Sequence, residues 1–336
     1  SYIGDGMDKS PVIYSTYDLL GILFIWCEQD FHPGTGRGTG VIDLSIQRDK
    51  VTGVPICRSS SLKGAIRSAL RPIANQIGLN LDELFGPDIY SPQAYQLRAG
   101  AIEFLNAGIL LYPIQSYIGL FAYITSPYQI MEYWFSHLRN GYNSPQIKNI
   151  VDELSNKVET LEEKLKNRKA IVPRNSIFVV DGKKMDIVLH YGDFVIRSDE
   201  YDEDEEFMKI LDILASQAIP RIRNNVFTGY SYLENKIKHA TILIRNEVFV
   251  DMVNKSLPRI TRIAIEPETK AVKRGALFIQ ELIPKHTLMA TGLYKAIRYA
   301  NNQQITKFKN AINLSLINVG GGETVGYGMI RLVVSP

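Results

Sequence analysis

The sequence predicts an α+β fold, because strand-like segments lie towards both ends of the 336-residue chain and helical patterns fill much of its middle. Residues 14–26 (YSTYDLLGILFIW) are rich in β-branched and aromatic residues and predict a first strand, with a buried helix as the competing interpretation. Residues 147–165 carry an apolar residue at every third or fourth position, which predicts a charged helix that packs one apolar face on a neighbour. A partner-binding coiled coil is the less favoured alternative for so short a run.

Further elements follow from the same patterns and from glycine and proline punctuation. Serines 59–61 predict a capped helix start, and the helix over 62–77 ends at Gly78. The acidic run 199–206 (DEYDEDEE) predicts a solvated or locally disordered loop rather than a metal site. The remaining predicted elements are strands at 100–105, 108–113, 119–125, 241–244 and 329–334, helices at 207–219 and 301–312, a hairpin at 176–188 and a longer hairpin at 259–279.

The composition is that of a globular protein, with 45% hydrophobic and 22% charged residues and a net charge of +3. Binding to nucleic acid would therefore require clustered rather than overall positive charge. Cys27 and Cys57 form no CxxC motif, so neither a zinc site nor a disulfide framework is expected. The first residues lack the layout of a signal peptide, and the apolar runs are too short to span a membrane. We therefore expect a soluble, cytoplasmic protein without a membrane partner.

The stretch 32–67 (HPGTGRGTGVIDLSIQRDKVTGVPICRSSSLKGAIR) combines a glycine-rich loop, an acid and a basic helix start. Unpaired N–H groups at a helix start, serine hydroxyls and two basic residues four positions apart, Lys63 and Arg67, suit a phosphate. A plain capped helix with a solvated basic face is the alternative. The glycines match neither the dinucleotide fingerprint nor a P-loop. A second glycine-rich loop at 320–328 could line the same groove, although a simple turn explains each loop equally well.

Asp43 is an acid inside an apolar run, directly after the first glycine loop. It is either a structural partner for Arg48 or a functional group that faces the groove. RNA carries its own nucleophile, the 2′-OH, so a ribonuclease needs only a base or metal ligand and an in-line geometry. His32 is a possible second participant, and a structural histidine is the commoner alternative.

The hairpin at 259–279 carries basic residues near its arms and tip: Arg259, Arg262, Lys270, Lys273 and Arg274. This concentration of positive charge favours an arm that contacts phosphates as much as it favours a merely exposed hairpin.

These motifs resemble a known family. The stretch 32–67 is similar to the first signature of the RAMP superfamily, and most similar to that of the repeated backbone subunit of type III-B (Cmr) CRISPR effector complexes. LFGPD (84–88), AGAIEFLNAGILLYPIQS (99–116), TRIAIEPETKAVKRGALFIQE (261–281) and INVGGGETVGYGMIRL (317–332) resemble the later signatures, in the same order.

The resemblance implies a modified ferredoxin-like (RRM-like) palm with a helical insertion and a thumb β-hairpin. The palm would comprise 1–126 and 221–336, with the thumb at about 258–280, and the insertion would comprise 127–220, including a β-hairpin and the acidic loop. Copies would stack head-to-tail along the guide RNA beside other Cmr subunits, and the thumb would cross the guide–target duplex and splay bases out.

The resemblance also implies that Asp43 cleaves target RNA at each kink with a divalent cation, Mg²⁺ or Mn²⁺, for which Asp43 is a possible ligand. The product would carry a 2′,3′-cyclic phosphate. The residue patterns and the resemblance together give the predicted RNA-binding set: Arg37, Arg58, Ser60, Ser61, Lys63, Arg67, Arg259, Arg262, Lys273, Arg274, Gly320, Gly321 and Gly322.

The chain departs from the family where Leu105-Asn106-Ala107 stands in place of Ser-Asp-Ala, so that the acid of the family is missing from this tripeptide. Cys57-Arg58 replaces small residues before the serines and adds charge near the phosphate path. Two further hypotheses remain open: a guide-RNA scaffold without catalytic activity, and a stand-alone guide-processing ribonuclease centred on a histidine.

Overall fold

A computed structural model describes residues 16–34, 45–88, 99–141, 145–265, 268–320 and 326–335, with side chains throughout except at 264–265 and 272–276. Thirteen strands of this part form one mixed sheet. Its central path follows the order β11 (Tyr201–Asp204), β6 (Ala170–Pro173), β14 (Thr241–Ile244), β5 (Leu120–Thr125), β4 (Ala107–Ser116), β17 (Leu288–Ala296), β1 (Tyr17–Cys27), β19 (Met329–Ser335) and β18 (Leu316–Asn318). Shorter strands join beside it: β2 (Ile56–Cys57), β3 (Ile102–Phe104), β9 (Ile187–Leu189) and β10 (Phe194–Ile196).

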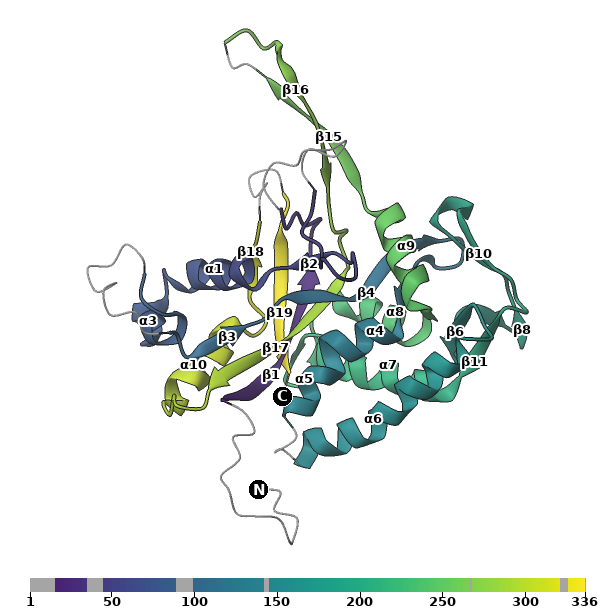
Figure 1. The fold of residues 1–336 in the computed structure, drawn as a ribbon, viewed down its shortest axis with the longest axis horizontal. Helices are drawn as coiled ribbons and strands as arrows, with labels where there is room; N and C mark the ends of the chain where they lie inside the picture. Colours follow the sequence, from purple (N-terminus) through teal and green to yellow (C-terminus); the bar gives the residue numbers. More distant parts are fainter. Residues whose placement is uncertain are drawn as a thin grey trace.

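The two faces of the sheet carry separate hydrophobic cores, because successive side chains of a strand point to opposite faces. In β1, Leu23 and Ile25 belong to one core, whereas Phe24 and Trp26 belong to the other. Helices α1 (Ser59–Leu70), α2 (Ala74–Ile77), α3 (Leu81–Phe85), α9 (Asn246–Ser256) and α10 (Asn302–Ile312) pack on the first face. Helices α4 (Pro127–Ile130), α5 (Ser136–Asn140), α6 (Pro145–Lys164), α7 (Glu205–Ala218) and α8 (Tyr230–His239) pack on the second, and a π-helical turn (Met131–Phe135) joins α4 to α5 (Figure 1).

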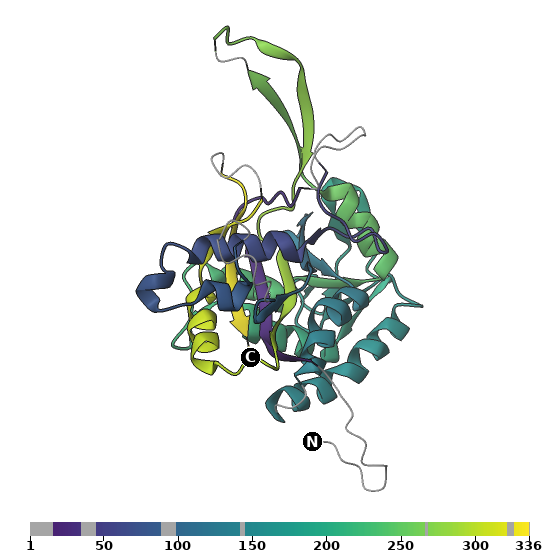
Figure 2. The same cartoon turned by 60° about the vertical axis from the view of Figure 1, so that its left-hand side comes forward.

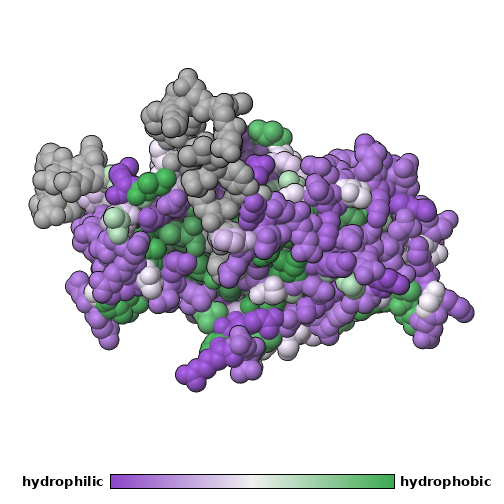
Figure 3. All heavy atoms as spheres, turned by 90° about the horizontal axis from the view of Figure 1, so that it is seen from below, coloured by the Kyte–Doolittle hydropathy of each residue, from purple (hydrophilic) through white to green (hydrophobic). Residues whose placement is uncertain are grey.

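A long antiparallel hairpin of β15 (Arg259–Ile265) and β16 (Val272–Glu281) forms its own two-stranded sheet. It projects from the body of the molecule in both ribbon views (Figures 1 and 2). Arg259 is paired with Glu281 at its base, where the two strands join the body. The face opposite the hairpin is mostly hydrophilic, with hydrophobic residues in separate small patches (Figure 3).

The strand and helix predictions are largely confirmed. The apolar stripe of α6 is buried through Val151, Leu154, Val158 and Leu161, as its spacing predicts. Gly78 ends the helical region with a φ of +67°, but residues 62–77 form two helices rather than one. Residues 176–188 contain the short hairpin β7 (Val179–Val180) and β8 (Lys183–Lys184), followed by β9. No helix among the described residues is both long and apolar enough to cross a membrane.

The prediction for the acidic run is wrong. Residues 201–204 form strand β11, which pairs in parallel with β6, and Asp204 caps α7 by accepting a hydrogen bond from the Phe207 N–H at 2.9 Å. Basic side chains offset the carboxylates: Arg168 pairs with Asp202 at 2.9 Å and Lys169 with Glu200 at 2.7 Å. Because these partners come from a neighbouring segment of the chain, the composition of the run could not reveal them.

The predicted division into a palm and an insertion at 127–220 stays a prediction. Strands β6 and β11 of that segment extend the same sheet through β14. Both cysteines are free and buried, and burial raises the pKa of the Cys57 thiol to about 12.

Candidate nucleic-acid interface

The described ends of both glycine-rich loops meet at His32. A Cβ atom at Gly34 would lie 2.8 Å from His32 Nε2, and a Cβ atom at Gly320 would collide with the His32 carbonyl oxygen. At the other end of the second loop, the Gly328 N–H donates to the Asp30 carbonyl at 2.8 Å. Gly34, at the start of the first loop, and Gly320 and Gly328, at the two ends of the second, therefore lie beside residues 30–32, whereas the end of the first loop lies outside the described residues.

His32 is only 6% exposed. Its Nδ1 lies 2.7 Å from the Glu281 carbonyl oxygen, which can only accept, so the proton is on Nδ1 and Nε2 carries the lone pair. Burial lowers the pKa of the imidazole, which is therefore neutral near pH 7. The His32 side chain therefore packs between the backbone of Gly34 and the backbone of Glu281. This arrangement gives no support to its predicted catalytic role.

Glu281 carries a buried carboxylate at the base of the hairpin, with 1% of its side chain exposed. Arg48 donates to both carboxylate oxygens, at 2.9 and 3.0 Å, and the Ile46 N–H donates at 3.3 Å. Burial alone would raise the pKa of this carboxyl, but the hydrogen bonds and charge of Arg48 hold it below its usual value. Arg48 also donates to Asn254 at 3.0 Å, so its guanidinium already has partners and does not depend on Asp43 for one.

Helix α1 begins next to these loop ends. Its N-cap is Arg58, without a side-chain cap, so the predicted serine cap is wrong: the serines form the first turn. The side chain of Asn106 takes the capping role, because its Oδ1 accepts from the Ser59 N–H at 2.9 Å. No acid lies in the first turn, which keeps the positive end of the helix dipole available to an anion.

Gln47 ties this helix start to the first glycine loop. Its amide donates to the Gly34 carbonyl at 2.9 Å and accepts from the Arg58 N–H at 2.8 Å, and the side chain is buried. A buried amide whose two ends bond two segments fixes their relative position. Sequence reasoning missed Gln47, Asn106 and Glu281, because their partners lie 11 to 249 positions away in the chain.

The predicted RNA-binding residues at the start of α1 differ in how far their side chains are free to contact RNA. Arg58 and Ser60 are exposed, and Ser61 and Lys63 are half-buried. Arg67, by contrast, donates to the Gly86 carbonyl at 2.8 Å and pairs with Asp82 at 2.9 Å. Its guanidinium is therefore committed to the loop around α3, which argues against the predicted sharing of a phosphate with Lys63.

The hairpin supplies the other described basic groups. Arg259 is exposed and lies 3.6 Å from the Glu281 carboxylate. The guanidinium carbon of Arg262 lies 5.8 Å from the ring centroid of Tyr327, which directly precedes Gly328. The hairpin arm and the end of the second glycine loop are therefore in contact. Four predicted site residues lie outside the described residues, namely Arg37, Asp43, Gly321 and Gly322, as do the side chains of Lys273 and Arg274.

Metal ligands do not gather in the described part of the chain, where no group of three or more His, Cys, Asp or Glu side chains could hold an ion. Glu281, the buried carboxylate at the base of the hairpin, is paired with Arg48. The described residues therefore do not form the divalent-cation site that the resemblance implies.

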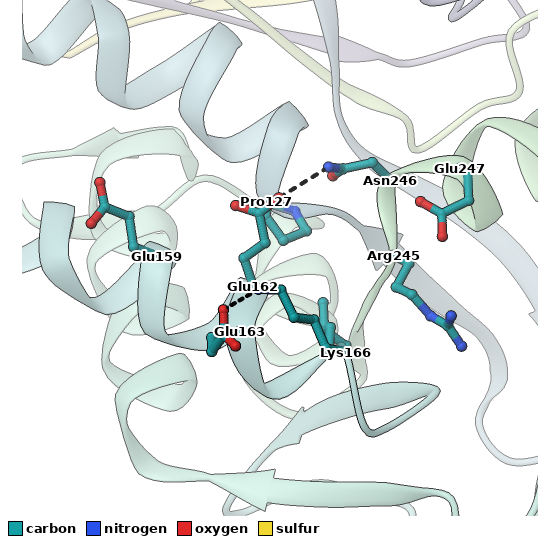
Figure 4. Close-up of a pocket in the computed structure, with 9 residues that line it drawn as sticks. Pro127, Glu159, Glu162, Glu163, Lys166, Arg245, Asn246 and Glu247 are labelled. Atoms are coloured by element: carbon teal, nitrogen blue, oxygen red, sulfur yellow. Dashed lines mark hydrogen bonds and ion pairs between the residues drawn. The ribbon is translucent and has the colours of Figure 1, made fainter.

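A pocket of about 450 Å³ lies elsewhere, at the end of α6 and the starts of α4 and α9 (Figure 4). Four glutamates line it, and the guanidinium of Arg245 points away from those of α6 (Figure 4). Lys166 pairs with Glu163 at 2.5 Å. Net negative charge makes this pocket unsuited to RNA phosphates.

Comparison with known proteins identifies two similar sequences. A protein of Pyrococcus furiosus named CRISPR system Cmr endoribonuclease Cmr4 is 29% identical over 305 residues, which cover 90% of this chain and 91% of that protein. A protein of Saccharolobus solfataricus named CRISPR system CMR subunit Cmr4 is 23% identical over 333 residues, which cover 96% and 98%.

Solved structures share the fold. A chain of the type III-B Cmr-beta complex in its apo state matches with a TM-score of 0.67 and 23% identity, covering 95% of this chain and 98% of that one. Oligomeric Cmr4 from Pyrococcus furiosus matches with a TM-score of 0.61 and 23% identity, covering 96% and 99%. The family model named RAMP superfamily matches residues 2–331. The resemblance drawn from five ordered motifs is thus confirmed, and this chain belongs to the RAMP superfamily.

Proposed function

We propose that this chain is the guide-RNA-binding backbone subunit of a type III-B (Cmr) CRISPR effector complex and that it also cleaves the complementary target RNA. The observation that carries the proposal is that the described ends of both glycine-rich loops, the start of α1 without an acid in its first turn, and the base of the hairpin lie together around His32 and Glu281. The name of the Pyrococcus furiosus relative, an endoribonuclease, supports the cleavage activity.

The guide backbone binds at the start of α1. The Leu62 N–H makes the first intrahelical bond, to the Arg58 carbonyl at 3.1 Å, so the N–H groups of Ser60 and Ser61 precede the hydrogen-bonded ladder. N–H groups at a helix start, a hydroxyl on each serine and the side chains of Arg58 and Lys63 together form a phosphate site without sequence preference. This lack of preference suits a subunit whose target is chosen by the guide.

Cleavage uses the target's own 2′-OH. The 2′-oxygen attacks the adjacent phosphorus in line with the leaving 5′-oxygen, its proton passes to the Asp43 carboxylate, and the P–O5′ bond breaks as the 5′-oxygen takes a proton from water. The products are a 2′,3′-cyclic phosphate and a 5′-hydroxyl. The hairpin distorts the duplex so that this in-line geometry is reached.

A requirement for Mg²⁺ or Mn²⁺ belongs to the proposal, with Asp43 as the possible ligand. When bound, the ion would neutralise charge on the reacting phosphate. The described residues supply no ligand set, so the steps above are assigned to the chain and the RNA alone.

The finer architecture is part of the same proposal. The sheet of β1, β17, β19 and β4 with α1 and α10 is the ferredoxin-like palm, and β15–β16 is the thumb. The complex forms in the cytoplasm from copies of this chain stacked head-to-tail, guide crRNA, target RNA and other Cmr subunits. The solved structures similar to this chain include an oligomeric Cmr4 and a Cmr-beta complex bound to cognate target RNA, which support the proposed stacking and RNA binding.

The test is Asp43→Asn in a complex reconstituted with guide RNA and its other subunits. Cleavage of a complementary target should be lost while guide affinity is retained, since the amide keeps the shape of the side chain and removes its charge and basicity. Cleavage at the wild-type rate would reject the catalytic assignment and leave a scaffold without catalytic activity.

A further inference from the structure

Glu281 contacts three segments of the chain: the residue His32, residues 46–48 and the first strand of the hairpin. Its backbone carbonyl accepts from His32 Nδ1 at 2.7 Å, its carboxylate bonds the Ile46 N–H and Arg48, and it pairs with Arg259 across the hairpin. It is the last residue of β16. The base of the hairpin and residues 45–48 therefore meet at one buried carboxylate.

The geometry of the Arg48–Glu281 pair is directional. The two guanidinium nitrogens face the two carboxylate oxygens at 2.9 and 3.0 Å, and a planar fork of this kind sets angle as well as distance. Arg48 is held from a second side by Asn254 of α9. A buried carboxylate is tolerated only with such partners, and separation of the pair would leave Glu281, among the described charged groups, with Arg259 alone, an exposed guanidinium at 3.6 Å.

Residues 45–48 are the described segment nearest to Asp43 in the chain. Three peptide steps separate Asp43 from Ile46, so covalent geometry alone keeps their Cα atoms within about 11 Å. The first glycine loop is closed beside this segment by the Gly34–Ile46 bridge, and the Gln47 N–H donates to the Pro33 carbonyl at 2.7 Å. A substitution that moves Ile46 relative to the hairpin therefore moves the described segment that lies next to Asp43 in the chain.

We propose that Arg48 and Glu281 are positioning residues for target cleavage: their ion pair holds residues 45–48, the described segment next to Asp43 in the chain, against the base of the β15–β16 hairpin. This inference rests on the proposed function. It assigns neither residue to the reacting atoms, because Glu281 is buried and Arg48 is bound on two sides.

Two variants separate positioning from general stability. Glu281→Gln keeps the shape and removes the charge, and Arg48→Lys keeps the charge and removes the planar fork. The matched control is Glu234→Gln, which breaks the partly buried Arg221–Glu234 pair (2.5 Å) that joins α8 to the segment after α7. Each variant is assembled into the full complex with guide and target RNA.

Three quantities are measured: guide affinity, the single-turnover cleavage rate constant at saturating target, and hydrogen exchange of the Ile46 and Gln47 amides. We expect both test variants to keep guide affinity within about two-fold and to lose about 10- to 100-fold in the rate constant, as a displacement of about 1 Å at a reacting group costs. Exchange at Ile46 and Gln47 should accelerate in both, and Glu234→Gln should change none of the three.

The inference is overturned if the two variants cleave at the wild-type rate, if their amide exchange is unchanged, or if cleavage falls only in proportion to lost guide binding. The last result would make the pair a folding element. Asp43→Asn, run in parallel, separates the two proposals: intact cleavage in that variant rejects the catalytic assignment, whereas the exchange measurement judges the anchoring of residues 45–48 by itself.

Discussion

The carbonyl oxygen of His32 occupies the space that a Cβ atom at Gly320 would need. Gly320 also has a φ of +84°, a conformation that disfavours other residues. Two loops almost 290 positions apart in the chain are thereby in direct backbone contact. The requirement for glycine at this position is steric as well as conformational, and the two causes can be separated by mutation.

Gly320→Ala should lower both the thermal stability of the protein and its guide affinity. Gly326→Ala is the matched control, because Gly326 has a nearly identical φ of +85° but open space where its Cβ would lie. Strain from φ should cost about 1 kcal/mol in either variant, and the collision with His32 should add about 1–3 kcal/mol at Gly320 alone. If Gly320→Ala and Gly326→Ala lost the same melting temperature and the same guide affinity, the close approach of Gly320 to the His32 carbonyl would contribute nothing to stability or binding.

Lys63→Ala should weaken guide binding and make it less dependent on salt. Loss of one phosphate contact should reduce the slope of log affinity against log salt concentration by about 0.7–0.9. Arg67→Ala should leave the slope unchanged and lower stability instead, because its guanidinium holds Gly86 and Asp82. Binding titrations over a range of salt concentrations and thermal unfolding distinguish them. A reduced slope in Arg67→Ala would restore that residue to the phosphate path.

Acidification should destabilise the fold through His137. Burial lowers the pKa of this imidazole to about 4, and its Nδ1 accepts from the Tyr294 hydroxyl at 2.8 Å. The unfolded chain binds a proton near the ordinary pKa and the folded protein does not, so this contribution is complete above about pH 6.5 and is lost as the pH falls towards 4, amounting to at most about 3 kcal/mol. Urea unfolding from pH 7 to 4 should show a smaller decline in His137→Gln than in the wild type. If the unfolding free energies of His137→Gln and the wild type declined equally with falling pH, His137 would be excluded as the source of the acid destabilisation.

Removal of divalent cations should stop target cleavage and leave guide binding intact. Chelation followed by titration with Mg²⁺ or Mn²⁺ measures both. Cleavage that persists after chelation would reject the cation requirement and leave Asp43 as a base that acts without an ion.

Much of the fold could be predicted because local patterns carry it. The β-branched and aromatic composition of β1, the three- and four-residue spacing in α6 and the glycine at 78 reflect which side chains can be buried and which backbone angles are allowed. The acidic run and the serine cap were misinterpreted for one reason. Their outcome depended on partners from other segments: Arg168 and Lys169 for the strand β11, and Asn106 for the start of α1.

The sequence by itself determined the family, the basic hairpin, the two glycine loops and the choice of Asp43, since these are properties of residue type and order along the chain. Only the tertiary structure decided that the His32 side chain is buried between backbone segments, that Arg67 pairs with Asp82 of α3 and that Arg48 pairs with Glu281, 233 positions away. A buried charge must find an opposite charge wherever the fold provides one, and composition does not say where that is.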